Sequence, residues 1–120
     1  MREPANISEK LKLFADHWHP RIIAQLDMYY LKLAKVKGEF VWHNHQNQDE
    51  MFLVLSGEIT IKMRDGNVTL NEGDVYIVPR GVDHCPEAAE EASLLLLERV
   101  DTPHTGDVVS RRTITTADWI

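Results

Sequence analysis

The chain has 120 residues, which fits one compact domain, and its 43% hydrophobic residues can build a core without disulfides. A formal net charge of −6 repels polyanions and argues against nucleic acid as a partner. The single cysteine, Cys85, cannot form an internal bridge, which favours a reducing compartment. The N-terminus does not resemble a signal peptide, and the longest apolar stretch, residues 94–97, is too short to span a bilayer. These features predict a cytoplasmic protein with no membrane partner.

The first twenty residues predict a helical arm. Apolar residues recur at helical spacing within residues 7–18. Asn6 or Ser8 can cap this helix, and Pro20 ends it.

After this arm the sequence predicts β-structure. Short apolar or alternating runs, bounded by turn residues, predict strands at residues 29–36, 40–45, 51–55, 59–63, 68–70, 74–78 and 94–100. Many short strands at close spacing predict a sandwich or barrel, and therefore an all-β fold. The runs at 51–55 and 93–97 are apolar on both faces, which predicts strands covered on both sides, as in two stacked sheets.

The remaining segments are more polar. Residues 86–92 predict an acidic loop or a single helical turn, and residues 101–120 predict a terminal strand or arm that Trp119 anchors. The only basic cluster alternates along a predicted strand and is expected to mark a solvated face; it consists of Lys32, Lys35 and Lys37.

Four residues that can bind a metal ion lie in two blocks bounded by glycine: His43, His45, Glu50 and His84. Side chains alternate faces along a strand, so His43 and His45 are expected to project the same way. Glu50 opens the next predicted strand, which is expected to lie beside that of the histidines. His84 follows a Pro-x-Gly turn that can deliver a third imidazole.

This set of donors predicts one divalent transition metal ion. Three imidazoles and one carboxylate suit iron(II), manganese, nickel, copper or zinc, whereas calcium and magnesium prefer oxygen ligands. Four protein ligands leave one or two positions open on a five- or six-coordinate ion, as a catalytic ion requires. An isolated His-x-His is also common among ordinary histidines, but these explain neither the glutamate nor the distant histidine. The other histidines are expected to be structural or exposed: His17, His19 and His104.

These residues resemble the two motifs of the cupin superfamily, specifically the small single-domain cupins often labelled mannose-6-phosphate isomerase-like. The first motif reads here as Gly38, His43, His45, Glu50 and Gly57. The second motif reads as Gly73, Pro79, Gly81 and His84. There are two departures: the gap between Gly38 and His43 is one residue shorter than usual, and Ala88 replaces the usual final asparagine.

The resemblance implies a double-stranded β-helix, or jelly-roll barrel, of two antiparallel sheets with the metal inside, and often a homodimer. It makes residues 1–120 a single domain, with residues 1–20 as the N-terminal arm and 29–100 as the barrel. Cupins include dioxygenases, isomerases, decarboxylases, storage proteins and sensory domains, so the fold does not fix a function. Glu50 argues against the thiol dioxygenases of this fold, which generally lack that glutamate.

Two functions remain open. The first is a metal-dependent enzyme, a dioxygenase or an isomerase, acting on a small oxygen-rich organic molecule. Its metal would bind adjacent substrate oxygens as a Lewis acid, and Glu50 would act as a general base if its pKa is raised. The second is a non-catalytic binding or sensor module that uses the metal to hold a small-molecule ligand.

Residues that contact the substrate follow only from strand parity. Val41 and Phe52 share a face with the expected ligands and are predicted to line the pocket. Arg80, in the Pro-x-Gly turn, would hold an anionic substrate or lie exposed in the turn.

Neighbours of the expected ligands are given other roles. Cys85 is expected to face away from the metal and to pack in the core. Trp42 is expected to fill the core between sheets or a dimer contact. Asp49 is a competing ligand, but the strand face favours Glu50.

Overall fold

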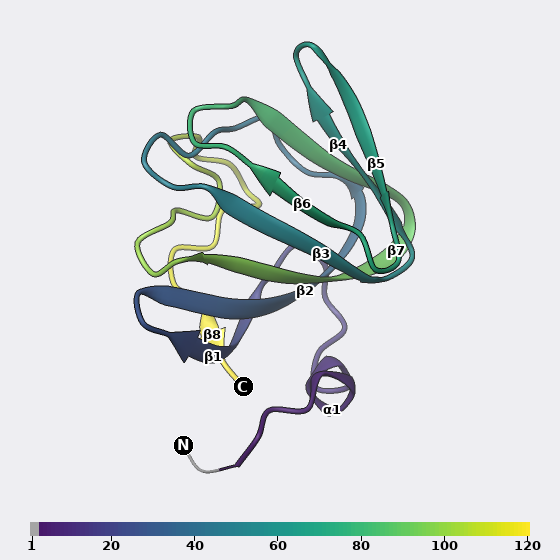
Figure 1. The fold of residues 1–120 in the computed structure, drawn as a ribbon, viewed down its shortest axis with the longest axis vertical. Coiled ribbons are helices and arrows are strands. Elements are labelled where there is room, and N and C mark those ends of the chain that lie inside the picture. Colours follow the sequence, from purple (N-terminus) through teal and green to yellow (C-terminus); the bar gives the residue numbers. More distant parts are fainter. Residues whose placement is uncertain (1–2) are drawn as a thin grey trace.

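The structure, a computed structural model, describes residues 3–120. One short helix precedes eight strands: α1 (Ile7–Leu11), β1 (Arg21–Leu26), β2 (Tyr29–Glu39), β3 (Glu50–Ser56), β4 (Glu58–Met63), β5 (Gly66–Asn71), β6 (Val75–Val78), β7 (His84–Arg99) and β8 (Asp118–Trp119). Figure 1 shows the strands wrapping around a common interior, with α1 packed below them. No helix in this part of the chain is long and apolar enough to cross a membrane.

The long strands β2 and β7 join the two halves of the fold. The strand order is β5-β4-β7-β2-β1-β8, and β3 pairs with both β7 and β6. The first residues of β7 pair with β4, whereas its later residues pair with β3. Over the described residues the sheet bends around the interior without closing (Figure 1). The all-β, jelly-roll prediction with a short N-terminal helix is therefore confirmed.

The interior is filled by inward-facing side chains of several strands. On β3, buried and half-buried residues alternate, so that Glu50, Phe52 and Val54 all face inward. Apolar residues of β2, β4 and β7 meet them there, among them Val36, Ile61 and Leu94. Glu50 thus ends an apolar row, and its carboxylate lies inside the fold.

A second apolar cluster covers the outer face of β2, β3 and β7. Its buried members are Phe14, Ile23, Leu33 and Leu95, and residues of the N-terminal arm and of β3 pack against them. The runs predicted to be apolar on both faces are therefore covered on both sides. The N-terminal arm covers their outer face, instead of the second sheet that was expected.

The helix is shorter than the sequence predicts. It begins after Asn6, whose side chain accepts a hydrogen bond from the amide of Glu9, and it ends at Leu11 instead of residue 18. Phe14 leaves the helical path because it inserts into the outer cluster, where the Lys35 ammonium donates to its carbonyl. Packing against the sheet overrides the local helical periodicity.

Residues 86–92 belong to β7, so the predicted acidic loop or helical turn is wrong. Two acidic side chains of this segment pair with basic residues: Glu87 with Lys62, and Glu91 with His17. The carbonyl of Pro86 accepts a hydrogen bond from the amide of Phe40. Pro86 therefore remains in the strand although it has no N–H to donate.

Candidate metal centre

The segment that carries His43 and His45 is not a strand, contrary to the prediction for residues 40–45. Its only β-type pairing is the bridge between His43 and His84, whose amides and carbonyls exchange hydrogen bonds of 2.9 and 3.0 Å. The amide of Gly81 donates to the carbonyl of His45 at 2.8 Å. The expectation that Glu50 lies on a neighbouring strand of these histidines is also wrong, because β3 pairs with β6 and β7.

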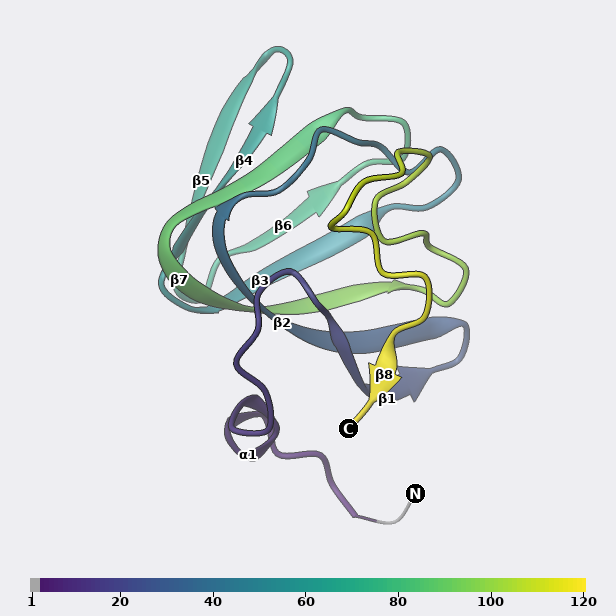
Figure 2. The same cartoon turned by 180° about the vertical axis from the view of Figure 1, so that it is seen from behind.

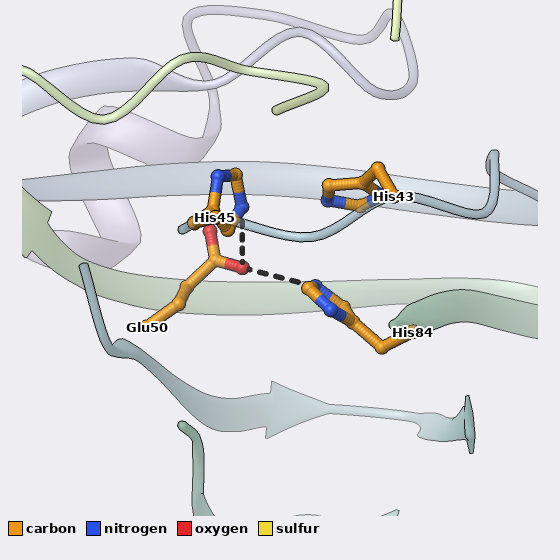
Figure 3. A group of neighbouring side chains, drawn as sticks. All are labelled: His43, His45, Glu50 and His84. Atoms are coloured by element: carbon orange, nitrogen blue, oxygen red, sulfur yellow. Dashed lines mark ion pairs between the residues drawn. The ribbon is translucent and has the colours of Figure 1, made fainter. Parts of the chain in front are cut away.

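The fold nevertheless brings the four expected side chains together. One donor atom from each of His43, His45, Glu50 and His84 lies within 4.8 Å of the others, and all four residues are buried. The Oε1 atom of Glu50 lies 3.5 Å from Nε2 of His45 and 3.5 Å from Nε2 of His84. Figure 3 shows this oxygen between the two rings, with the His43 ring beside them. The group could hold a metal ion.

Hydrogen bonds to backbone carbonyls orient two of the rings. Nδ1 of His43 lies 2.9 Å from the carbonyl oxygen of Val41, and Nδ1 of His84 lies 2.9 Å from that of Val82. A carbonyl only accepts, so each Nδ1 carries the hydrogen, and in the neutral ring each Nε2 offers a lone pair. Such a partner on the second ring nitrogen is typical of metal-binding histidines.

The charge states also favour a cation. Burial, with the nearby charge of His84, lowers the pKa of His43 to about 4, so this imidazole is neutral near pH 7. Burial alone would raise the pKa of Glu50. Interactions with the side chains of Glu98, His45 and His84 outweigh it and hold that pKa well below its ordinary value. Glu50 is therefore an anion in a buried pocket.

Ring nitrogen atoms without hydrogen-bond partners indicate whether these residues fit a metal ion. Nε2 of His84 and both ring nitrogens of His45 are buried and have no hydrogen-bond partner among the described residues. Buried polar atoms without a partner are costly, and a coordinated ion would satisfy them. The donor set and this deficit both fit a first-row divalent ion.

A second buried carboxyl, Glu98, stands behind Glu50. The two residues are direct partners in the antiparallel pairing of β3 with β7, and each side chain shifts the pKa of the other. The Lys32 ammonium donates to Glu98 at 2.7 Å, and both side chains are at most about 10% exposed. The sequence predicted that Lys32 lies on a solvated face. This prediction is wrong, because Lys32 is buried. Burial and the Glu50 charge raise the pKa of Glu98 well above its ordinary value.

A small apolar chamber adjoins two of the four donor residues, His43 and Glu50. It has a volume of about 40 Å³, and His43, Glu50 and Phe52 contribute to its wall. Trp18 stacks on Phe40 with ring centroids 4.6 Å apart at the same wall. The sequence predicted the position of Phe52 but gave no role to Trp18. Trp18 is buried, and its backbone has a positive φ of +61°.

His104 also belongs to this neighbourhood, although the sequence gave it only a structural or exposed role. Its ring lies 5.0 Å from that of Phe40, and its Nδ1 accepts the amide N–H of Ile114 at 2.9 Å. It lines the chamber together with His43. Burial, followed by the charge of Lys32, lowers the pKa of His104 to about 4. No motif could have revealed it, because its position depends on the path of the C-terminal segment.

The other residues singled out from the sequence lie around the centre. Val41 is half-buried and contributes its carbonyl to His43. Arg80 is exposed and pairs with Asp49 at 3.3 Å, and neither lines the chamber. Cys85 is fully buried, and burial raises the pKa of its thiol.

Trp42 does not fill the core, and its alternative role in a dimer contact stays a prediction. It is half-buried, and the Arg64 guanidinium lies over its ring at 3.8 Å from the centroid.

Comparisons with known proteins agree with this arrangement. The family described as "Cupin domain" matches residues 30–98, which is more than half of the chain. A crystal structure of a cupin-2 domain containing protein from Shewanella frigidimarina is similar, with 47% identity and a TM-score of 0.77; the match covers 78% of this chain and 92% of that one.

Two curated relatives match over shorter stretches. A Bacillus subtilis protein named YdbB is 35% identical over 63 residues, which cover 52% of this chain and 56% of that protein. The 3-hydroxyanthranilate 3,4-dioxygenase of Xanthomonas oryzae is 29% identical over 69 residues, covering 54% of this chain and 39% of the enzyme. The chain thus spans about half the length, or less, of these relatives.

Proposed function

Because the chain belongs to the cupin family, we propose that it is a metal-dependent enzyme acting on a small, oxygen-rich organic molecule. In this proposal one divalent transition metal ion is held by His43, His45, Glu50 and His84. The observation that carries it is the convergence of four buried donor atoms within 4.8 Å. Two of their histidines already have carbonyl partners for the nitrogen that would not bind the ion.

The relatives favour dioxygenase chemistry over an isomerase. The chain is similar to part of an enzyme named 3-hydroxyanthranilate 3,4-dioxygenase, and a putative dioxygenase of Saccharolobus solfataricus is 31% identical over 58 residues, covering 48% of this chain and 15% of that protein. A bound first-row ion would supply Lewis-acid polarisation and, where it is redox-active, electron transfer.

The protein side chains would bind and orient the reactants. Val41 and Val82 fix the ring orientations of His43 and His84 through their carbonyls, and Glu98 fixes the carboxylate of Glu50. The apolar wall at Phe52 limits water at the centre. The general-base role of Glu50 requires a raised pKa, and its pKa is instead held low. Glu50 is accordingly proposed as an anionic ligand.

Metal binding can be tested directly. Protein purified without added metal is subjected to elemental analysis, then stripped with a chelator and titrated with Mn²⁺, Fe²⁺, Ni²⁺, Cu²⁺ and Zn²⁺. We expect about one equivalent of metal and a higher melting temperature, because an ion that binds only the folded state stabilises it. His84→Ala should lose both effects, whereas His17→Ala, an exposed histidine paired with Glu91, should keep them. No metal and no thermal shift in the wild type would end the proposal.

Activity needs its own test. Oxygen consumption and product formation are measured with 3-hydroxyanthranilate, catechols, flavonols and sugar phosphates, using each metal that binds. Turnover that Glu50→Gln abolishes and Asp49→Asn preserves would support the proposal, because Asp49 is exposed and lies outside the chamber. Tight binding of a panel member without turnover would identify a binding module instead.

A further inference from the structure

A cavity of about 560 Å³ lies beneath the C-terminal segment, residues 100–117, where this segment faces β1 and β2. Figure 2 shows the segment crossing the side of the fold on its way to β8. The volume falls within the range of small-molecule sites, roughly 300–1,000 Å³. The chamber at the metal centre has about 40 Å³, whereas benzene needs a cavity of about 150 Å³. The body of an organic ligand therefore fits the cavity and not the chamber.

The cavity adjoins the chamber. Pro20 and His104 line both spaces, so these two residues form the partition between them. His104 is held in place by Phe40 and by the amide of Ile114. A ligand in the cavity that reaches past His104 would enter the chamber at His43.

The lining of the cavity favours a particular ligand chemistry. Much of it is apolar, including Ile22, Val100, Ile114 and Trp119. Among the described residues that line it, Lys32 is the one permanent charge, and none is an aspartate or glutamate. An apolar body with one anionic group matches such a surface.

Lys32 has donors to spare for that group. An ammonium has three N–H donors, and Glu98 accepts one of them. Glu98 in turn contacts Glu50, so only one side chain separates the cation of the cavity from the carboxylate of the metal centre. The cation and the metal centre are thus neighbours across Glu98.

We propose that this cavity binds a small organic acid with an apolar body, whose carboxylate pairs with Lys32 and whose opposite end points past His104 toward the metal centre. The proposed binding of the acid does not require a metal ion, whereas the proposed orientation of the acid rests on the proposed function.

The test uses the full chain, labelled with ¹⁵N and stripped of metal with a chelator. It is titrated with benzoate and, for comparison, with the uncharged benzamide and the cationic benzylamine, and amide shifts are recorded by NMR. Benzoate should bind at least tenfold more tightly than either comparison ligand and should shift amides of β2 and of residues 102–117. Equal affinities, no binding, or shifts confined to other segments would overturn the proposal.

Two variants with matched controls locate the site. Lys32→Met should weaken benzoate binding at least tenfold, whereas Lys35→Met, on the same strand but bonded to the carbonyl of Phe14, should not. Ala117→Trp places a large side chain in the cavity while it keeps both Lys32 and Glu98, and it should also weaken binding. Ala89→Trp, at an exposed position of β7, is its control. If Lys32→Met does not fold, the Ala117→Trp comparison decides; unchanged binding in it contradicts the proposal.

The metal-loaded protein tests the orientation. With Mn²⁺ bound, the ring protons of benzoate should broaden through the nearby paramagnetic ion, and unbroadened signals of bound benzoate would contradict the orientation. Benzoate binding without any metal binding would overturn the proposed function and leave the acid site standing. Metal binding without benzoate binding would overturn the acid site alone.

Discussion

Glu98 lies directly opposite Glu50 in the antiparallel pairing of β7 with β3, and both carboxyls are buried. Two neighbouring buried carboxyls avoid the repulsion of like charges when one of them keeps a proton. The pKa of Glu98 is raised, first by burial and then by the charge of Glu50, so Glu98 is the carboxyl that keeps the proton. Glu50 is left as the anion that faces the histidines.

Replacing Glu98 should change metal affinity according to whether the new side chain can still donate a hydrogen bond to Glu50. Glu98→Gln keeps an N–H donor toward Glu50 and should bind metal nearly as well as the wild type. Glu98→Leu removes the donor and should lower metal affinity about 10–100-fold, which is typical of lost outer partners of ligands. Competition with a fluorescent chelator measures both. Equal affinity in the wild type and Glu98→Leu would show that Glu98 does not position Glu50.

The Lys32–Glu98 pair should be sensitive to the loss of one partner only. Lys32→Met leaves the buried Glu98 carboxyl without its hydrogen-bond donor and should lower the free energy of unfolding by about 1–3 kcal/mol. The double variant Lys32→Met/Glu98→Leu removes both polar groups and should recover most of that loss. Urea unfolding monitored by circular dichroism measures these differences. A double variant no more stable than Lys32→Met would contradict this account.

The stability of the fold should fall with pH as His104 gains a proton. Burial lowers the pKa of His104 from 6.5 to about 4, so between these values the unfolded chain binds more protons than the folded one. Its contribution is fully present above pH 6.5 and declines as the pH falls toward 4, with a limiting slope of about 1.4 kcal/mol per pH unit. Unfolding at several pH values measures it. His104→Gln should show a shallower slope over this range, and an unchanged slope would assign the effect to other groups.

Gly106 should tolerate no side chain. A Cβ atom there would overlap the carbonyl oxygen of Asn44, which lies between His43 and His45, and the φ of Gly106 is +58°. Gly106→Ala should lower the free energy of unfolding by about 1–3 kcal/mol and also weaken metal binding, because Asn44 must move.

Gly73→Ala is the matched control for Gly106→Ala. Gly73 has a φ of +89°, but a Cβ there meets no atom within 4 Å. Gly73→Ala should therefore lose stability through backbone strain and keep its metal affinity. Thermal unfolding measures the loss of stability in both variants, and chelator competition measures their metal affinity. Equal metal affinities in Gly106→Ala and Gly73→Ala would contradict the inference that Gly106 acts on the candidate metal centre through Asn44.

The four donors could be found from the sequence because their residue types and spacing are unusual together. The reason given for their convergence was only partly right. His43 and His45 do face one centre, but they do so through backbone bonds to His84 and Gly81 and not as alternating residues of a strand. A motif identifies the residues of a site more securely than it identifies the hydrogen bonds that hold them.

What the sequence missed depends on distant partners. Lys32 looked like one of three solvated lysines, because nothing local shows that Glu98, 66 residues away, lies beside it. Phe14 fitted a helical pattern, yet it lies outside the helix because it packs in the second apolar cluster, on the outer face of the sheet. His104 reaches the chamber only because the C-terminal segment folds back over the barrel. Local patterns carry no information about such long-range contacts.

The length of β7 has a practical consequence for altering this protein. His84 is the first residue of this strand and Glu98 lies next to its last, so both ends lie at the candidate metal centre. One inserted or deleted residue between them would reverse the side on which one of them projects. The turn between β4 and β5 is no safer, because Met63 at its start pairs directly with His84. Affinity tags and fluorescent labels are therefore best inserted outside β7 and outside this turn.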